Sequence, residues 1–340
     1  MRVECPGCHK VYEIPDDRFK SNKKVTLPCP KCNTHIDIDP ASSLNNPATP
    51  EDSKPDILSG EALKEKIVRS VGDLPPMPQA IFKAREILQD PNSSIKELAE
   101  VLESDPAIAA KVLQMANAPY YGMSGKVSSL QSASVVLGQK TIGELLTMAG
   151  ASNVLGNTLE GYGLEAGFMW RHSLGVAFAS RKIASMKHPS LTNDAFTAGL
   201  IHDVGKLVLD PYIVERKKTF ESFMEDGQKT FLEAERAILG FSHSEIASEL
   251  CKVWGVPASL AKAIQFHHDP ALSNNDPLTY IIHTADALAM MTGLGLGVDG
   301  ILYQLDQNAP LVLGLGEEET SEIMVETVVS VEDMMSEMKN

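Results

Sequence analysis

Four of the five cysteines in this chain form two CxxC pairs, and twenty residues separate the pairs. They are Cys5, Cys8, Cys29 and Cys32. Four soft thiolate ligands suit one tetrahedral zinc ion, and each two-residue loop lets a pair of sulfur atoms face the same ion. About forty residues cannot bury enough apolar surface to fold without such a cross-link. We therefore predict a small β zinc ribbon over residues 1–39, with four unligated cysteines as the alternative.

Short runs of alternating apolar residues predict the strands of this ribbon. They lie at Val11–Ile14, Val25–Leu27 and Ile36–Ile38. His9 and His35 lie beside the CxxC pairs, but four sulfur atoms already complete the coordination of zinc. The segment resembles the zinc-ribbon finger at the N-terminus of many bacterial signalling and envelope proteins, which reads CPxC, an aromatic residue, IPD and CxxC.

Charge and hydropathy limit the surroundings and the partners of the chain. Paired cysteines that bind metal are expected in a reducing compartment, and no run of about 18 uncharged apolar residues is present to span a membrane. We therefore expect a cytoplasmic protein without membrane association. The formal net charge is −15, and residues 1–40 carry seven Lys and Arg against six Asp and Glu. Because no basic patch is visible, we do not expect nucleic acid as a partner.

The composition changes at residue 40, and the pattern becomes helical from residue 58 onward. Residues 40–57 contain four prolines and many small polar residues, which predicts a flexible linker. Beyond it, helix starts recur as the capping boxes Ser94–Glu97 and Ser242–Glu245 and as Asp-Pro pairs at residues 105–106 and 276–277. With no convincing run of strands there, we predict an all-α bundle. Eight acids against one lysine from Leu315 onward predict a solvated, acidic C-terminal helix.

Several motifs between residues 60 and 300 together resemble the HDOD family, whose name denotes an HD-related output domain. The motifs are LPxxP from Leu74, DPxxS from Asp90, LAxxxxxDPA from Leu98, ANxPxYG from Ala116 and SxxxAxxxLG from Ser129. The resemblance implies a helical N-terminal lobe at residues 58–160 and a lobe like an HD phosphohydrolase at residues 161–340. It also implies a role in bacterial signal transduction, in a family whose members mostly lack catalysis.

Resemblance to HD enzymes also implies a set of metal ligands, because those enzymes use a histidine, a His-Asp doublet, a later aspartate and, in two-metal members, further histidines. The matching residues are His172, His202, Asp203, His243, His267, His268 and Asp286. Imidazole and carboxylate donors suit one or two ions of iron, manganese, zinc or nickel, which Asp203 could bridge. Each residue alone could instead be a buried hydrogen-bonding side chain. Because neighbours on a helix point about 100° apart, one of His267 and His268 is expected to point away.

Three classes of function remain open. The first is a regulatory binding module that presents a helical surface to signalling protein partners and holds a metal or a nucleotide in the HD-like site. The second is a metal-dependent phosphohydrolase or phosphodiesterase acting on a nucleotide or cyclic dinucleotide. Asp203 and Lys206 would be its catalytic residues, with Lys206 as a point charge that contacts a substrate phosphate. The third is a nucleic-acid-binding regulator that uses the ribbon. The doublet and the double histidine resemble the HD-GYP cyclic di-GMP phosphodiesterases, but no GYP element follows here, and we expect the first class.

Overall fold

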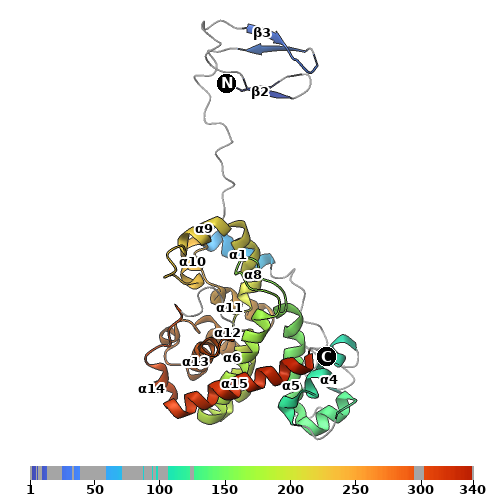
Figure 1. Ribbon diagram of the computed structural model, residues 1–340, viewed down its shortest axis with the longest axis vertical. Helices are drawn as coiled ribbons and strands as arrows, with labels where there is room; N and C mark the ends of the chain where they lie inside the picture. Colours follow the sequence, from blue (N-terminus) through green and yellow to red (C-terminus); the bar gives the residue numbers. More distant parts are fainter. Residues whose placement is uncertain are drawn as a thin grey trace. The chain divides into compact units, whose positions relative to one another are not determined.

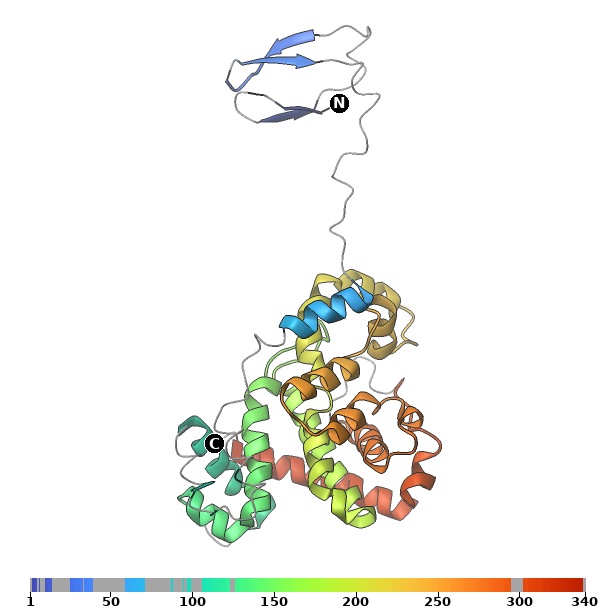
Figure 2. The same ribbon diagram turned by 180° about the vertical axis from the view of Figure 1, so that it is seen from behind.

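The computed structural model (Figures 1 and 2) divides the chain into two units, Met1–Leu58 and Ser59–Asn340. The structure describes residues 2–4, 6, 10–13, 25–32, 34–38, 59–70, 87, 94, 97–98, 106–122, 126–294 and 302–338. The predicted linker at residues 40–57 therefore lies outside the described residues. Among those that are described, the first unit contributes strands and the second contributes helices.

The first unit contains two antiparallel strand pairs. Strand β1 (Arg2–Glu4) pairs with β2 (Val11–Glu13), and β3 (Val25–Pro28) pairs with β4 (His35–Ile38). Each pair is short, as expected where a metal site and not a large apolar core holds the strands. The predicted strands at residues 25–27 and 36–38 and the described part of the strand from residue 11 are confirmed, whereas β1 was not predicted.

The second unit opens with α1 (Gly60–Ser70), α4 (Pro106–Ala116), the short 3₁₀ helix η4 (Pro119–Tyr121) and α5 (Leu130–Leu155). The capping box predicted at Ser94 is present, since the Glu97 N–H donates to Ser94 Oγ at 3.1 Å and the Ser94 N–H donates to Glu97 Oε2 at 3.0 Å. Helix α5 bends at Gly138, whose φ of 81° is open to glycine because it lacks a Cβ.

The rest of the unit is a bundle of helices. They are α6 (Phe168–Lys187), α7 (Thr192–Ile201), α8 (Gly205–Glu215), α9 (Lys217–Phe223), α10 (Phe231–Ile238), α11 (His243–Val253), α12 (Ala258–Gln265), α13 (Pro277–Met291), α14 (Ala309–Leu313) and α15 (Glu317–Met338). The short 3₁₀ helices η5 (Pro189–Leu191) and η6 (Pro270–Ser273) lie between them. The capping box predicted at Ser242 starts α11, and Asp276 caps α13 as predicted. The all-α prediction for this part of the chain is confirmed.

Helix α6 is the centre of this bundle. It packs against α7, α13 and α15, and most of its side chains are buried. Helix α11 packs in turn against α8 and α12. This arrangement brings the end of α7, the start of α11 and the end of α12 close to α6 and α13. No helix among the described residues is long and apolar enough to cross a membrane.

The C-terminal helix α15 differs from the expectation of a solvated helix. It packs against α6, α4 and η4, and Figure 1 shows its C-terminal end close to α4. Its inner face buries Ile323, Val331 and Met334, each 0% exposed, while its acids lie on the other faces. Lys182 and Lys187 of α6 pair with acids of α15, at 2.5 Å to Glu326 and 2.7 Å to Glu319. The acidic helix is therefore amphipathic and part of the core.

Candidate metal centre

The seven predicted ligands of the second unit lie together, although they come from five places in the chain. His172 lies on α6 and Asp286 on α13, while the His202-Asp203 doublet fills the turn between α7 and α8. His243 is the first residue of α11, and the double histidine follows the end of α12 at Gln265. All of these side chains are buried or nearly so. The bundle thus brings the whole set into one buried cluster.

Asp203 is at the centre of the cluster, and its two carboxylate oxygens face different histidines. Oδ1 lies 3.1 Å from His243 Nε2 and 3.8 Å from His267 Nε2. Oδ2 lies 3.5 Å from His202 Nε2 and 3.8 Å from His172 Nε2. One carboxylate placed in this way is suited to bridge two ions.

The imidazole rings are held with their Nε2 atoms toward the cluster. The Nδ1 atoms of His172, His202 and His267 donate to the carbonyl oxygens of Leu294, Gly199 and Ile264 at 3.1, 2.8 and 2.7 Å. A carbonyl only accepts, so each Nδ1 carries the hydrogen and each Nε2 keeps its lone pair.

Two ring nitrogens of the cluster, His202 Nε2 and His267 Nε2, are buried without a hydrogen-bond partner in the structure as described. Asp203 Oδ1 is buried as well and faces His243 Nε2 at 3.1 Å. Buried acceptors of this kind are costly unless something binds them. Imidazole nitrogens and carboxylate oxygens are donor atoms that transition metals prefer, so the site fits a metal ion.

The separations between donor atoms divide the cluster into two positions. The first position comprises His172, His202 and Asp203. Asp286 borders it, since its Oδ1 lies 3.1 Å from His172 Nε2 and 3.8 Å from His202 Nε2, and it also forms a group with His202 and His267. The second position comprises Asp203, His243, His267 and His268, with 3.0 Å between the Nε2 atoms of His243 and His268. Two ligands that each lie about 2.0–2.2 Å from one ion are separated by roughly 3 Å or somewhat more, which matches these distances.

The expectation that one of His267 and His268 points away is wrong. Both contribute a nitrogen to the second position, and their ring centroids are 4.0 Å apart. The pair follows the last helical residue, Gln265, so the 100° rotation between helical neighbours does not apply. His283 fixes this turn, because its Nδ1 donates to the His267 carbonyl at 2.7 Å and its Nε2 accepts from the Asp306 N–H at 2.8 Å.

Charges inside the cluster prepare most of its members for metal binding. Burial raises the pKa of Asp203 and Asp286, but the facing histidines, and Lys206 in the case of Asp203, lower both below the usual carboxyl range. Burial lowers the pKa of His267 to about 3, with a further contribution from His202, so its ring is neutral at pH 7. His172 and His243 differ, because facing carboxylates outweigh burial. Asp286 raises the pKa of His172, and Glu235 and Asp203 raise the pKa of His243 to about 9.

Lys206 does not extend toward open space in this structure. Its ammonium pairs with Asp203 Oδ2 at 2.6 Å, and this charge compensates the buried carboxylate. Asp203 and the neighbouring charges raise the pKa of Lys206, although burial opposes this. Contact with a substrate phosphate therefore stays a prediction.

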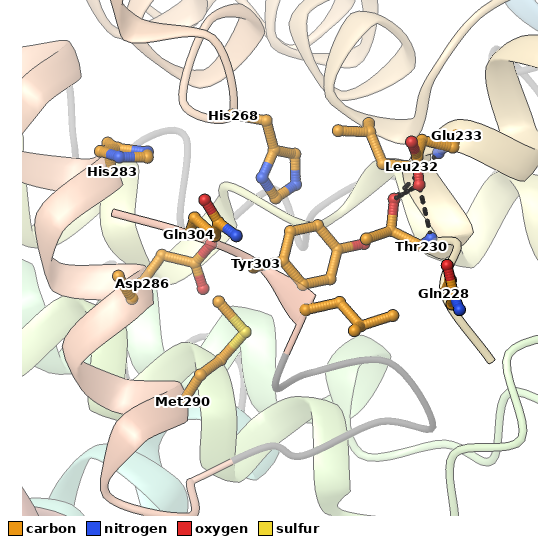
Figure 3. Close-up of a pocket in the computed structure, with 12 residues that line it drawn as sticks. Gln228, Thr230, Leu232, Glu233, His268, His283, Asp286, Met290, Tyr303 and Gln304 are labelled. Carbon is orange, nitrogen blue, oxygen red and sulfur yellow. Dashed lines mark hydrogen bonds between the residues drawn. The ribbon is translucent and has the colours of Figure 1, made fainter. Parts of the chain in front are cut away.

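A cavity of about 360 Å³ opens beside the second position. His268 and Asp286 line it together with Gln228, Thr230, Tyr303 and Gln304, among other side chains, and Figure 3 shows these side chains around it. The ring of Tyr303 stacks on His268, with 5.1 Å between ring centroids. Among the described residues that line the cavity there is no Lys or Arg. The volume lies at the small end of the range for ligand pockets, roughly 300–1,000 Å³.

Sequence reasoning missed two side chains of the site. Glu235 accepts from His243 Nδ1 at 2.8 Å, and the Tyr162 hydroxyl donates to Glu235 at 2.6 Å. No motif marks either residue, since Glu235 lies within an ordinary amphipathic helix and Tyr162 in a loop. Of these two residues, only Glu235 could have been suggested from the sequence, by a search for acidic residues shortly before a ligand histidine.

The ribbon is only partly described. Cys29 is buried and Cys32 exposed, and both lie at the loop between β3 and β4. The Lys31 N–H donates to Cys29 Sγ at 3.4 Å, as backbone amides do at thiolate ligands. Cys5 and Cys8 lie outside the described residues, so the four-cysteine site stays a prediction from the sequence.

Comparisons with known proteins agree with this architecture. The solved structure of a Shewanella amazonensis SB2B protein, whose name gives phosphohydrolase only as a conjecture, is 23% identical, with 80% of this chain and 97% of that chain covered and a TM-score of 0.63. The solved structure of a Marinobacter aquaeolei VT8 protein, whose name gives signal transduction only as a conjecture, is 21% identical. The match covers 92% of this chain and 75% of that chain, with a TM-score of 0.63. Both likenesses show the fold.

Sequence comparison reaches the family. An uncharacterized protein of Treponema pallidum (strain Nichols) is 20% identical over 61% of this chain, and the match spans about 40% of that protein's length. The zinc-ribbon domain family matches residues 1–37. The HDOD domain family matches residues 74–270, which is more than half of the chain. The protein therefore belongs to the HDOD domain family.

Proposed function

We propose that this protein is a regulatory binding module of bacterial signal transduction whose HD-like lobe holds one or two first-row transition-metal ions. The observation that supports it best is the orientation of the histidines, since three Nδ1 atoms donate to backbone carbonyls and leave Nε2 directed at the shared carboxylate of Asp203. A structural histidine would satisfy both nitrogens, as His283 does. Iron, manganese, zinc and nickel all accept this donor set.

The cavity beside the metal positions favours binding over hydrolysis of a highly charged substrate. Its described lining includes the acids Glu233 and Asp286 and no Lys or Arg. Lys206, the nearest predicted phosphate contact, is engaged by Asp203. Enzymes that transfer phosphoryl groups surround the developing charge with cations. A ligand with a single anionic group and a neutral polar body, such as a mononucleotide, fits this lining better than a cyclic dinucleotide.

A second candidate is a metal-dependent phosphohydrolase, as the conjectural name of the Shewanella relative suggests. The observation in its favour is that the cavity reaches His268, a ligand of the second position, and Asp286, which borders the first. Bound metal ions would polarise a phosphate oxygen and lower the pKa of a bound water. Asp203 would hold the ions, and Lys206 would have to leave Asp203 to contact the substrate.

We propose that signalling proteins bind to the helical surface and to the zinc ribbon. The net charge of −15 disfavours nucleic acid and anionic membrane surfaces. A cytoplasmic location is part of the same proposal, because thiolate zinc ligands are maintained where thiols stay reduced.

Elemental analysis of the full-length protein tests the metal centre. We expect about one zinc from the ribbon and one or two further first-row metal ions, and Asp203→Ala should lose the further ions while keeping the ribbon zinc. His188→Ala, which changes a histidine outside the cluster, is the matched control. Equal metal content in wild type and Asp203→Ala would refute the proposal. Hydrolysis of bis(p-nitrophenyl) phosphate by the metal-loaded wild type, lost in Asp203→Ala, would instead favour the phosphohydrolase.

A further inference from the structure

We propose that Glu235 and Tyr162 are a positioning pair that builds the second metal position. In this view Glu235 holds His243 through Nδ1, and Tyr162 ties Glu235 to the loop between α5 and α6. The inference rests on the proposed function, because it requires that the cluster binds metal.

Both carboxylate oxygens of Glu235 contact His243. Its two carboxylate oxygens lie 3.0 and 2.8 Å from His243 Nδ1, and Oε2 also accepts the backbone N–H of His243 at 2.8 Å. Ring and backbone of one residue are thus held by one carboxylate, at the first residue of α11. Because His243 cannot rotate without breaking these bonds, its Nε2 stays directed at Asp203 Oδ1, 3.1 Å away.

This arrangement sets His243 apart from the ligand histidines whose Nδ1 donates to a backbone carbonyl. The acceptors for His172, His202 and His267 are neutral, whereas the acceptor for His243 carries a negative charge. A carboxylate behind a ligand imidazole makes Nε2 a stronger donor to a metal ion. The second position therefore has a feature that the first position does not share among the described residues.

The buried charge of Glu235 is a second reason to place a metal ion on His243. Glu235 is 0% exposed, and within the described part of the chain no Lys or Arg lies within ion-pair distance of it. A buried carboxylate is costly unless a positive charge compensates it. Among the described residues His243 is the ion-pair partner of Glu235 when its ring is protonated, and a metal ion on Nε2 would supply the same charge from the far side of the ring.

Tyr162 fixes the other side of Glu235. Its hydroxyl donates to Glu235 Oε1 at 2.6 Å, and Tyr162 itself is 3% exposed. The loop that carries it is closed by the Leu159–Leu164 bridge and docks on α8, where Asp210 Oδ1 accepts the Gly161 N–H at 2.8 Å. A Cβ on Gly161 would lie 2.7 Å from the Asp210 carbonyl oxygen, so only glycine allows this close approach. The loop between the lobes is thereby linked to a metal ligand.

Cobalt(II) titration of the metal-free, full-length protein tests this inference. Wild type should bind cobalt at the ribbon and at the two positions of the cluster. Glu235→Gln keeps the shape and a hydrogen-bond acceptor but removes the charge, and it should weaken one cluster equivalent about 10–100-fold. Tyr162→Phe should weaken the same equivalent by a smaller factor. Glu249→Gln, which neutralises an acid elsewhere on α11, should bind like wild type.

The weakened equivalent must be the second position. In a His172→Ala background, which removes a ligand of the first position, Glu235→Gln should therefore weaken the cobalt that remains in the cluster. Unchanged affinity in Glu235→Gln, or an equal loss at both positions, would overturn the inference while leaving the metal centre intact. A wild type that binds cobalt only at the ribbon would overturn the proposed function as well. Thermal melting checks each variant, and Tyr162→Phe decides the matter if Glu235→Gln does not fold.

Discussion

Gly205 lies so close to His243 that a Cβ added to it would be 1.9 Å from the His243 carbonyl oxygen. This contact joins the start of α8 to the start of α11, and it lets the doublet before α8 reach the histidine on α11. The glycine is thus required by the site geometry as well as by packing. The distance between Asp203 and His243 depends on it.

We expect Gly205→Ala to destabilise the protein by about 3 kcal/mol, at the upper end of the usual cost of overpacking, because the clash is with backbone and not with a flexible side chain. The variant should also lose metal from the second position. Urea unfolding and metal content are the measurements. Gly316→Ala is the control, since its Cβ would meet only Glu319 Oε2 at 3.9 Å. Equal unfolding free energies of the two variants would contradict the packing argument.

Lys206→Met should destabilise the metal-free protein by roughly 3 kcal/mol, because it leaves the buried carboxylate of Asp203 without its ammonium partner. Bound metal supplies positive charge to the same carboxylate, so the loss should shrink when the protein is metal-loaded. Chemical denaturation with and without metal measures both values. Lys252→Met, at an exposed pair with Glu249, should change either value by less than about 1 kcal/mol. A loss that is independent of metal would show that Lys206 acts only in packing.

The metal-free protein should lose stability as the pH rises from about 6.5 to 9. The pKa of His243 is raised to about 9 in the folded chain by Glu235 and Asp203, against burial, from an ordinary value of 6.5. Between pH 6.5 and pH 9 the folded state therefore keeps a proton that the unfolded state releases. The stabilisation from this proton is fully present below pH 6.5 and is lost as the pH rises through 9. A shift of this size corresponds to roughly 3 kcal/mol. Unfolding at fixed pH values should show the decline, and Glu235→Gln should reduce it.

The residues that form the His and Asp cluster could be named from the sequence, because short motifs in a fixed order along the chain carry them. Their orientation could not be, and for His267 and His268 the helical assumption failed where α12 had already ended. Glu235 escaped prediction because it reaches His243 only after the chain reverses between α10 and α11. Tyr162 lies 73 residues from Glu235 in sequence, and no local pattern connects them.

The fold was predictable for a similar reason, since capping boxes and Asp-Pro pairs act within one helical turn. The burial of α15 was missed because its many acids dominate the composition. The residues that decide its burial, such as Ile323 and Met334, lie on one narrow face. Whether this face of α15 is buried depends on α6, which packs against it but lies far away in the sequence.

Apolar contacts, and not the ion pairs with α6, should hold α15 in place. Ile323→Ala should cost about 2–4 kcal/mol, because it removes a fully buried side chain from the core. Glu326→Gln should cost less than about 1 kcal/mol, because the Glu326 carboxylate is 50% exposed and solvent screens its pair with Lys182. Val325→Ala, at a position 67% exposed, is the control and should stay within about 0.5 kcal/mol of wild type. Urea unfolding of the three variants at low and high salt measures these costs. If Glu326→Gln cost more than Ile323→Ala at low salt and little at high salt, the helix would be held by its charges, and salt would release it from α6.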